Sequence, residues 1–360
     1  MRIVAKQLFV LIFSFALLYA VIWCFTYIVY PTTRNYLDTY QDAVYFSNDK
    51  PEYYLYGRGA GLVVRGRGLL AENVSNIVVT GASTSVEGFR PPVMQKYITN
   101  GIVHNLSIGA SNMTQVGQVV DLVLEATPED KRNNLHFIVG VSYVLLRPDS
   151  EMWPGGVTNV ETEMLKYGMY KSKGESRFRS AHYKYFISFL RPILIVDELF
   201  RRVVTDHLFK TIWYINNKWL RPMQFLISDN LNRVSVSEEY KVYVDREMHR
   251  RMGSVNDEIG DEQFERLIDI SKKVHQSSAK LTVVDLPLAK WHMLKSKHFA
   301  SYQKNKMHFF ERLKEIGTVN IIDMQYMNND DDFYDFAHPK PQTSVQWSSY
   351  LGEILSKMKY

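Results

Sequence analysis

A serine after an apolar run and an aspartate–histidine pair near the C-terminus are the residues of this 360-residue chain whose types and spacing could support nucleophilic chemistry. Ser83 follows the β-branched run Ile77–Thr80 and a small-residue turn at Gly81. A strand that ends in such a turn lifts a side chain to the edge of a sheet with its backbone N–H beside it, a common position for a serine nucleophile. Many turns of this composition only join a strand to a helix, so the interpretation depends on what the rest of the chain supplies.

The C-terminal part of the chain supplies a candidate base. Asp335 and His338 are three residues apart, between an apolar run at 319–324 and the last helical pattern. On a loop, one turn of chain brings the carboxylate against the imidazole. A serine triad needs that contact, because the carboxylate fixes the histidine tautomer and stabilises the imidazolium. The neighbouring run Asp330–Asp332 has two other interpretations, a solvated acidic turn and a loose cation site.

Candidate oxyanion donors follow the second apolar run. We expect the backbone N–H groups of Ser83 and Gly109 and the side-chain amide of Asn112 to point into one pocket. Each well-placed donor can lower the barrier by about 3 kcal/mol. Gly109 is also interpretable as a strand-end turn, and Asn112 as the N-cap of a helix that begins at Met113.

The elements that must position these residues alternate along the chain. Apolar runs without strict alternation predict five strands, at Ile77–Thr80, Val103–Ile108, His136–Leu146, Leu281–Leu286 and Val319–Met324. Helical patterns separate them, at Pro92–Thr99, Met113–Ala126, Glu262–Gln276, Ser301–Ile316 and Thr343–Met358. This order predicts an α/β fold with a parallel sheet covered on both faces. Ligands of such sheets bind at the carboxyl ends of the strands, where Ser83 is expected to lie.

The N-terminal segment predicts a membrane helix. Leu8–Tyr30 carries no charged residue, and as a helix it would span about 34 Å, enough to cross a bilayer. Arg2 and Lys6 precede it, which places the N-terminus in the cytoplasm and the chain after Pro31 outside. A cleaved signal peptide is the alternative, but no Ala-x-Ala-like site follows the run.

The composition of the whole chain, 46% hydrophobic and 22% charged, is typical of a globular protein. The only cysteine, Cys24, lies in the predicted anchor, so the exported part cannot form a disulfide and must be stabilised by its core. These features favour a protein of the bacterial cytoplasmic membrane with a periplasmic or cell-surface domain.

The predicted organisation is an anchor at 1–31, a tyrosine-rich stalk at 32–75 and a main domain at 76–360, with an insertion at 147–261. The insertion mixes aromatic and basic residues between 183 and 226, and from Lys171 to Arg221 there are eleven Lys or Arg and four Asp or Glu. This segment has two compatible interpretations, an amphipathic surface that rests on the membrane or a membrane partner, and a helical cap on the sheet.

In this order, the motifs resemble the SGNH/GDSL hydrolase superfamily: Gly81-Ala-Ser83, Gly88-Phe-Arg-Pro91, Asn105-Leu-Ser-Ile-Gly109 and Asp335-Phe-Ala-His338. The resemblance covers most of 70–150 and 260–360. It implies a flavodoxin-like three-layer α/β/α fold, with Ser83 as nucleophile, His338 as base, Asp335 as its orienting carboxylate and Gly109 as an oxyanion donor.

The single N-terminal anchor and the long insertion look like the envelope acyl-transfer branch of that superfamily. This branch includes DltD-like D-alanyl transfer proteins and alginate O-acetylation proteins, which work beside a membrane-bound O-acyltransferase on a glycan or polymer acceptor. Two features depart from the family pattern. Gly-Ala-Ser replaces Gly-Asp-Ser, and Gly140–Tyr143 stands where a Gly-x-Asn-Asp block is expected, so Asn112 is only a substitute donor.

The sequence thus predicts a membrane-anchored serine acyltransferase or esterase without a metal or another cofactor. Asp245 and His249 lie in a helix or surface turn without converging partners, so a zinc site is not expected. The Gly57–Gly68 segment lacks the context of a nucleotide-binding loop, and the exported location argues against nucleic acid. The alternatives are a non-catalytic adaptor of an acylation or polysaccharide-export complex and a lipid esterase.

Overall fold

The structure is a computed structural model that describes residues 2–29, 63, 70, 73–149, 192–193, 236–253, 258–317 and 319–358. Most of the predicted stalk at 32–75 and all but two residues of the aromatic, basic segment at 183–226 lie outside these residues. The chain divides into two compact units. One contains the N-terminal helix, and the other contains the sheet and all candidate site residues.

Helix α1 (Arg2–Val29) is the N-terminal element of the first unit, and it confirms the predicted apolar helix. Within Arg2–Thr26, the most apolar 18-residue window has a mean hydropathy of 2.6. Among the described residues, this helix is long and apolar enough to cross a bilayer. Its large apolar side chains are exposed along most of its length, as a lipid-facing helix requires. A signal sequence meets the same criteria of length and composition.

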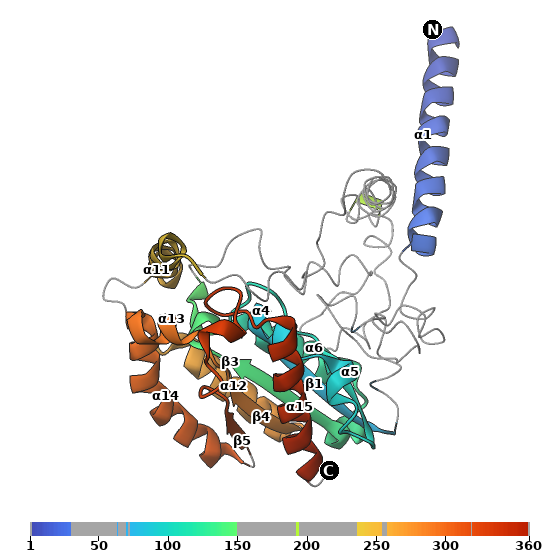
Figure 1. Ribbon diagram of the computed structural model, residues 1–360. Coiled ribbons are helices and arrows are strands. Elements are labelled where there is room, and N and C mark those ends of the chain that lie inside the picture. The colour runs from blue at the N-terminus through green and yellow to red at the C-terminus, as the bar shows by residue number, and fades with distance from the viewer. Residues whose placement is uncertain are drawn as a thin grey trace, which may run out of the picture. The chain divides into compact units, whose positions relative to one another are not determined.

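A parallel five-stranded sheet forms the centre of the second unit, as predicted (Figure 1). The strands are β1 (Ser75–Gly81), β2 (Gly101–Asn105), β3 (Leu135–Val141), β4 (Lys280–Asp285) and β5 (Val319–Asp323), in the order β2-β1-β3-β4-β5. The three middle strands are buried along almost all of their length, which explains their continuous apolar sequences. Their parallel register places all carboxyl ends at one edge of the sheet.

Helices cover the two faces of the sheet. One layer consists of α6 (Met113–Ala126), α12 (Glu262–Gln276) and α14 (Lys297–Ile316), which pack side by side. The other consists of α4 (Ser83–Gly88), α5 (Pro91–Met94) and α15 (Pro341–Lys357). Helices α11 (Glu238–Met252) and α13 (Lys290–Lys295) lie near the carboxyl ends of the strands (Figure 1).

Aromatic packing joins helices of the first layer, and a buried ion pair joins that layer to the sheet. In the first layer, the ring of Phe264 stacks on Phe309 with centroids 4.3 Å apart. At the end of β4, the Asp285 carboxylate accepts a hydrogen bond from Lys306 Nζ at 2.6 Å and another from Tyr302 at 2.7 Å. A buried charge is tolerated only when it is paired in this way, so the contact ties α14 to the sheet.

Several predicted boundaries are wrong for physical reasons. The third strand ends at Val141 instead of Leu146, because the apolar residues that follow form the 3-10 helix η3 (Tyr143–Leu146) and stay buried there. The second strand ends at Asn105 instead of Ile108, where the Asn105 side chain accepts the Ser107 N–H, although the Leu106 N–H still donates to the Val79 carbonyl of β1. The sequence predicts only a turn at Ser83, where the short helix α4 begins.

Candidate active site

Ser83, His338 and Asp335 form a continuous hydrogen-bonded chain. The Oγ of Ser83 lies 2.7 Å from Nε2 of His338, and Nδ1 of His338 lies 2.5 Å from Oδ2 of Asp335. The imidazole therefore contacts the hydroxyl with one nitrogen and the carboxylate with the other. This is the contact pattern of a serine triad, in which each group sits within reach of the proton that it must take or stabilise.

The Asp335–His338 loop is closed by its own backbone. Phe333 and Pro339 form an antiparallel bridge, and the Tyr334 N–H donates to the His338 carbonyl at 3.2 Å. Inside this turn, Oδ1 of Asp335 accepts the backbone N–H groups of Ala337 and His338, both at 2.7 Å. One carboxylate oxygen is thus used to hold the loop, which leaves the other for the imidazole.

Helix α13 supports the loop from behind. The Ala289 N–H donates to the Phe336 carbonyl at 3.0 Å, and the buried ring of His292 packs against the Phe336 ring with centroids 4.8 Å apart. The Asp330 carboxylate accepts the Trp291 N–H at the start of the same helix, at 2.8 Å. Asp330 therefore has a structural role in capping α13.

Close packing shapes the turn that presents Ser83. Gly81 and Gly140 are register partners at the ends of β1 and β3, and a Cβ at either position would collide with the Ser85 side chain. The amide of Asn105 donates to the carbonyls of Ser85 at 2.9 Å and Phe89 at 2.7 Å. The end of β2 therefore fixes the short helix that begins with the serine.

Helix α15 holds the other side of α4. Ser348 Oγ accepts the Arg90 N–H at 2.8 Å and lies 3.2 Å from the Gly88 carbonyl. A Cβ at Gly88 would meet the Trp347 ring at 2.8 Å, so the close approach of the two helices requires glycine. The Asp335–His338 loop directly precedes α15. The contacts between α15 and α4 therefore couple the position of His338 to that of Ser83.

The charges around His338 favour its protonated form. Burial lowers the pKa of His338, but the hydrogen bond and the charge of Asp335, with a further contribution from Glu87, raise it above its ordinary value overall. Burial raises the pKa of Asp335, yet the hydrogen bond and charge of His338 and the two backbone N–H groups lower it overall. Asp335 is therefore ionised and stabilises the imidazolium that forms when His338 takes a proton.

A tyrosine and a glutamate extend the site. The Tyr334 ring stacks on the His338 imidazole with centroids 5.5 Å apart and planes at 10°. Its hydroxyl donates to the carboxylate of Glu87, four residues after Ser83 on α4. Burial, together with this hydrogen bond, raises the pKa of Tyr334, so it stays a donor. Tyr334 and Glu87 thus connect the base to the helix of the nucleophile.

The loop after β2 carries Gly109 to the same edge. Ile108 N–H and Ser111 Oγ both donate to the Gly81 carbonyl, at 2.9 and 3.2 Å, which fixes the loop two residues before Ser83. Ala110 adopts a left-handed conformation with φ of 60°. The Ser83 N–H is the first of a helix, and such groups have no acceptor within their own helix. The role of the Ser83 and Gly109 N–H groups as oxyanion donors stays a prediction.

Asn112 is not available as an oxyanion donor. It is the N-cap of α6, where its side chain accepts the Gln115 N–H in a capping box. Its amide nitrogen donates to the Arg147 carbonyl at 3.0 Å and to Asp149 Oδ1 at 2.7 Å. Both amide hydrogens are used, so the capping interpretation is correct and the expectation of a third donor at Asn112 is wrong.

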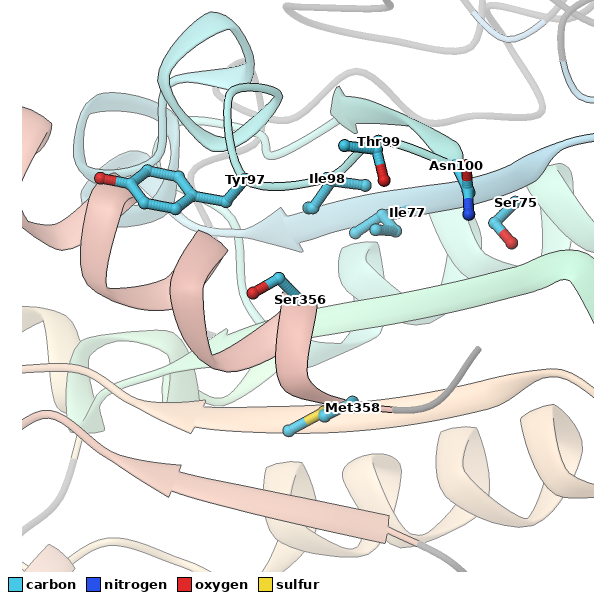
Figure 2. A pocket seen from close by; sticks show the side chains of 8 residues that line it. All are labelled: Ser75, Ile77, Tyr97, Ile98, Thr99, Asn100, Ser356 and Met358. Carbon is cyan, nitrogen blue, oxygen red and sulfur yellow. The ribbon is translucent and has the colours of Figure 1, made fainter.

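Two further observations concern metal binding and a hollow elsewhere in the second unit. Among the described residues, no three His, Cys, Asp or Glu side chains are grouped so that they could hold a metal ion. A hollow of about 240 Å³ lies between the start of β1, the segment after α5 and the end of α15 (Figure 2). It is at the amino ends of the strands, and Ser83 follows a carboxyl end, so this hollow is not part of the Ser83 site.

No protein-family model matches this chain, and no curated protein sequence matches it with significant similarity. The interpretation of the site therefore rests on its geometry.

Proposed function

We propose that this protein is a membrane-anchored serine acyltransferase or esterase of the SGNH type. The observation that carries the proposal is the hydrogen-bonded chain from Ser83 Oγ through His338 to Asp335. The strand order supports it, because β2-β1-β3-β4-β5 is the flavodoxin-like order, in which ligands bind at the carboxyl ends of the strands. The Ser83 turn follows the end of β1, next to the point where the order reverses.

The reaction follows from the contacts. Ser83 Oγ attacks the carbonyl carbon of an acyl donor while His338 Nε2 takes its proton, and the oxyanion forms against the Ser83 and Gly109 N–H groups. His338 then gives the proton to the leaving group, which leaves an ester on Ser83. An acceptor hydroxyl or water loses its proton to His338 and attacks this ester, and His338 returns the proton to Ser83 Oγ as the bond between the acyl group and the serine breaks.

The proposed setting is the outer side of the bacterial cytoplasmic membrane. Arg2 and Lys6 favour a cytoplasmic N-terminus, and α1 is long enough to retain the domain at the bilayer. The proposed partner is a membrane-bound O-acyltransferase, and the proposed acceptor is a hydroxyl of an envelope polysaccharide or polymer that receives an acetyl or D-alanyl group.

A non-catalytic adaptor with the same fold is the second candidate. The observation that favours it concerns the residues directly after β3. Their side chains make contacts other than those expected of an oxyanion site. Tyr143 there bonds His292 Nε2 at 2.5 Å, and its ring stacks with both the His292 and the His298 rings. An adaptor would keep the Ser83–His338 contact without turnover. A lipid esterase would share the triad and differ in its acceptor.

Turnover of an activated acetyl ester separates these candidates. The full chain in detergent is compared with Ser83→Ala and His338→Ala, with Ser356→Ala, an exposed serine near the end of α15, as a matched control. The acyltransferase proposal expects hydrolysis by the wild type and by Ser356→Ala, and a loss of about 10³-fold or more in the other two. No turnover by the folded wild type supports the adaptor, and equal turnover in all four proteins refutes the triad.

A further inference from the structure

The turn from Ile108 to Ser111, which contains the expected oxyanion donor Gly109, has a strained backbone. The Ser111 N–H donates to the Ile108 carbonyl at 3.3 Å and closes the turn. Ala110, the third residue of the turn, has a φ of 60°. Glycine is the usual residue at such a position, because the Cβ of any other L-residue is crowded there by the backbone. Alanine therefore keeps this conformation only where other contacts hold it.

Arg147 holds this turn from the segment that follows β3. Its side chain is buried, and Nη2 donates to the Ala110 carbonyl at 2.6 Å. The Arg147 carbonyl in turn accepts a side-chain N–H of Asn112 at 3.0 Å. The arginine is thus bonded to the chain on both sides of Ser111, once through its guanidinium and once through its backbone. A charged donor makes a stronger hydrogen bond than a neutral one, so the guanidinium is suited to hold a strained residue in place.

The contacts of the turn leave two N–H groups available beside the nucleophile. The Gly81 carbonyl accepts the Ile108 N–H at 2.9 Å and Ser111 Oγ at 3.2 Å, so the turn is fixed two residues before the serine of the triad. Within the described part of the chain, the N–H groups of Gly109 and Ala110 donate to no backbone carbonyl. Gly109 is half-buried and Ala110 is exposed, so a substrate can reach both.

We propose that Arg147 is a positioning residue that holds Ala110 in its left-handed conformation, so that the N–H groups of Ala110 and Gly109 face the oxyanion of the acyl intermediate. This inference rests on the proposed function and supplies a donor in place of Asn112. Donors that are fixed before the reaction stabilise the developing charge without reorganisation. A turn that relaxed away from the left-handed conformation would lose this advantage. Arg147 therefore accelerates the reaction without touching the substrate.

Steady-state hydrolysis of an activated acetyl ester by the full chain in detergent tests this role. Arg147→Gln should lower kcat about tenfold or more and leave KM within about twofold, because the donors act on the charged intermediate. Adding Ala110→Gly should restore most of kcat, because glycine adopts a positive φ without help from the arginine. Adding Ser278→Gly should restore nothing. Ser278 is the other described non-glycine residue with a left-handed backbone, with φ of 64°, and it lies between α12 and the amino end of β4.

Ala110→Val keeps the test decisive if circular dichroism shows that Arg147→Gln does not fold. Ala110 is exposed, so a larger side chain is accommodated there, but a β-branched residue disfavours a φ of 60°. This variant should lose kcat, whereas Ser278→Val, which has the same backbone conflict at another exposed position, should keep it.

Ser83-dependent turnover that is unchanged in Arg147→Gln or in Ala110→Val would overturn the inference and leave the proposed function standing. A loss of kcat in Arg147→Gln that Ala110→Gly does not recover would have the same meaning, because the arginine would then act on something other than the turn. A folded wild type without Ser83-dependent turnover would refute the proposed function and the inference together.

Discussion

Asp335→Asn changes one atom of the site and should remove activity while leaving the fold intact. In the wild type, Oδ1 of Asp335 holds two backbone N–H groups and Oδ2 holds His338 Nδ1. An asparagine can keep its oxygen on the two N–H groups, which places its NH₂ against Nδ1. The imidazole is then forced into the tautomer that carries its hydrogen on Nε2, and it cannot accept the proton of Ser83.

The expected loss is large. The same change in a serine triad lowers kcat by about 10⁴-fold, which corresponds to about 5.4 kcal/mol at 1.36 kcal/mol per factor of ten. Stability should barely change, because the two backbone hydrogen bonds persist. Asp335→Ala instead leaves those two N–H groups without the carboxylate, and each buried unsatisfied donor costs about 1–3 kcal/mol.

Ester hydrolysis and thermal unfolding are measured on the same preparations of both variants. The expected result is an Asn variant that unfolds like the wild type and is inactive, and an Ala variant that is both inactive and less stable. An Asn variant that keeps more than about a tenth of the wild-type rate, in a protein where Ser83→Ala is inactive, would show that Asp335 does not orient the base.

Two further changes probe the surroundings of the triad. Glu87→Gln removes a negative charge that, together with the charge of Asp335, raises the pKa of His338. Because His338 must be neutral to act as a base, the acid limb of the kcat/KM profile should move to lower pH, and an unchanged limb would contradict the coupling. Gly140→Ala places a Cβ against the side chain of Ser85, which packs behind the turn that presents Ser83. It should cost about 1–3 kcal/mol in denaturant unfolding, and an unaltered midpoint would show that this contact is loose.

Much of the sheet is predictable from sequence because its middle strands are buried on both faces. Such strands read as continuous apolar runs, and Ile77–Thr80 is a clear example. The same signal fails at the end of β3, since Tyr143–Leu146 remains buried after the chain has left the sheet. Burial determines where apolar residues occur in the sequence. The apolar pattern therefore does not show where the pairing of strands ends.

The candidate site shows a similar division. The spacing of Asp335 and His338 predicts their contact because it is local. Asn112 has the same amide whether it caps a helix or binds an oxyanion, so only the positions of Gln115 and Asp149 decide between the two roles. The contact of Tyr334 with Glu87 joins residues that are 247 positions apart, and no local sequence pattern predicts such a pair.

The most direct test of the central claim is covalent labelling of Ser83. The full chain in detergent is treated with a fluorophosphonate, digested, and mapped by peptide mass spectrometry, with His338→Ala treated in parallel. We predict a single adduct on Ser83 in the wild type and a strongly reduced adduct in His338→Ala, because the hydroxyl is activated through His338 Nε2 at 2.7 Å. A folded wild-type chain without an adduct on Ser83, or one labelled equally with and without His338, would contradict the account.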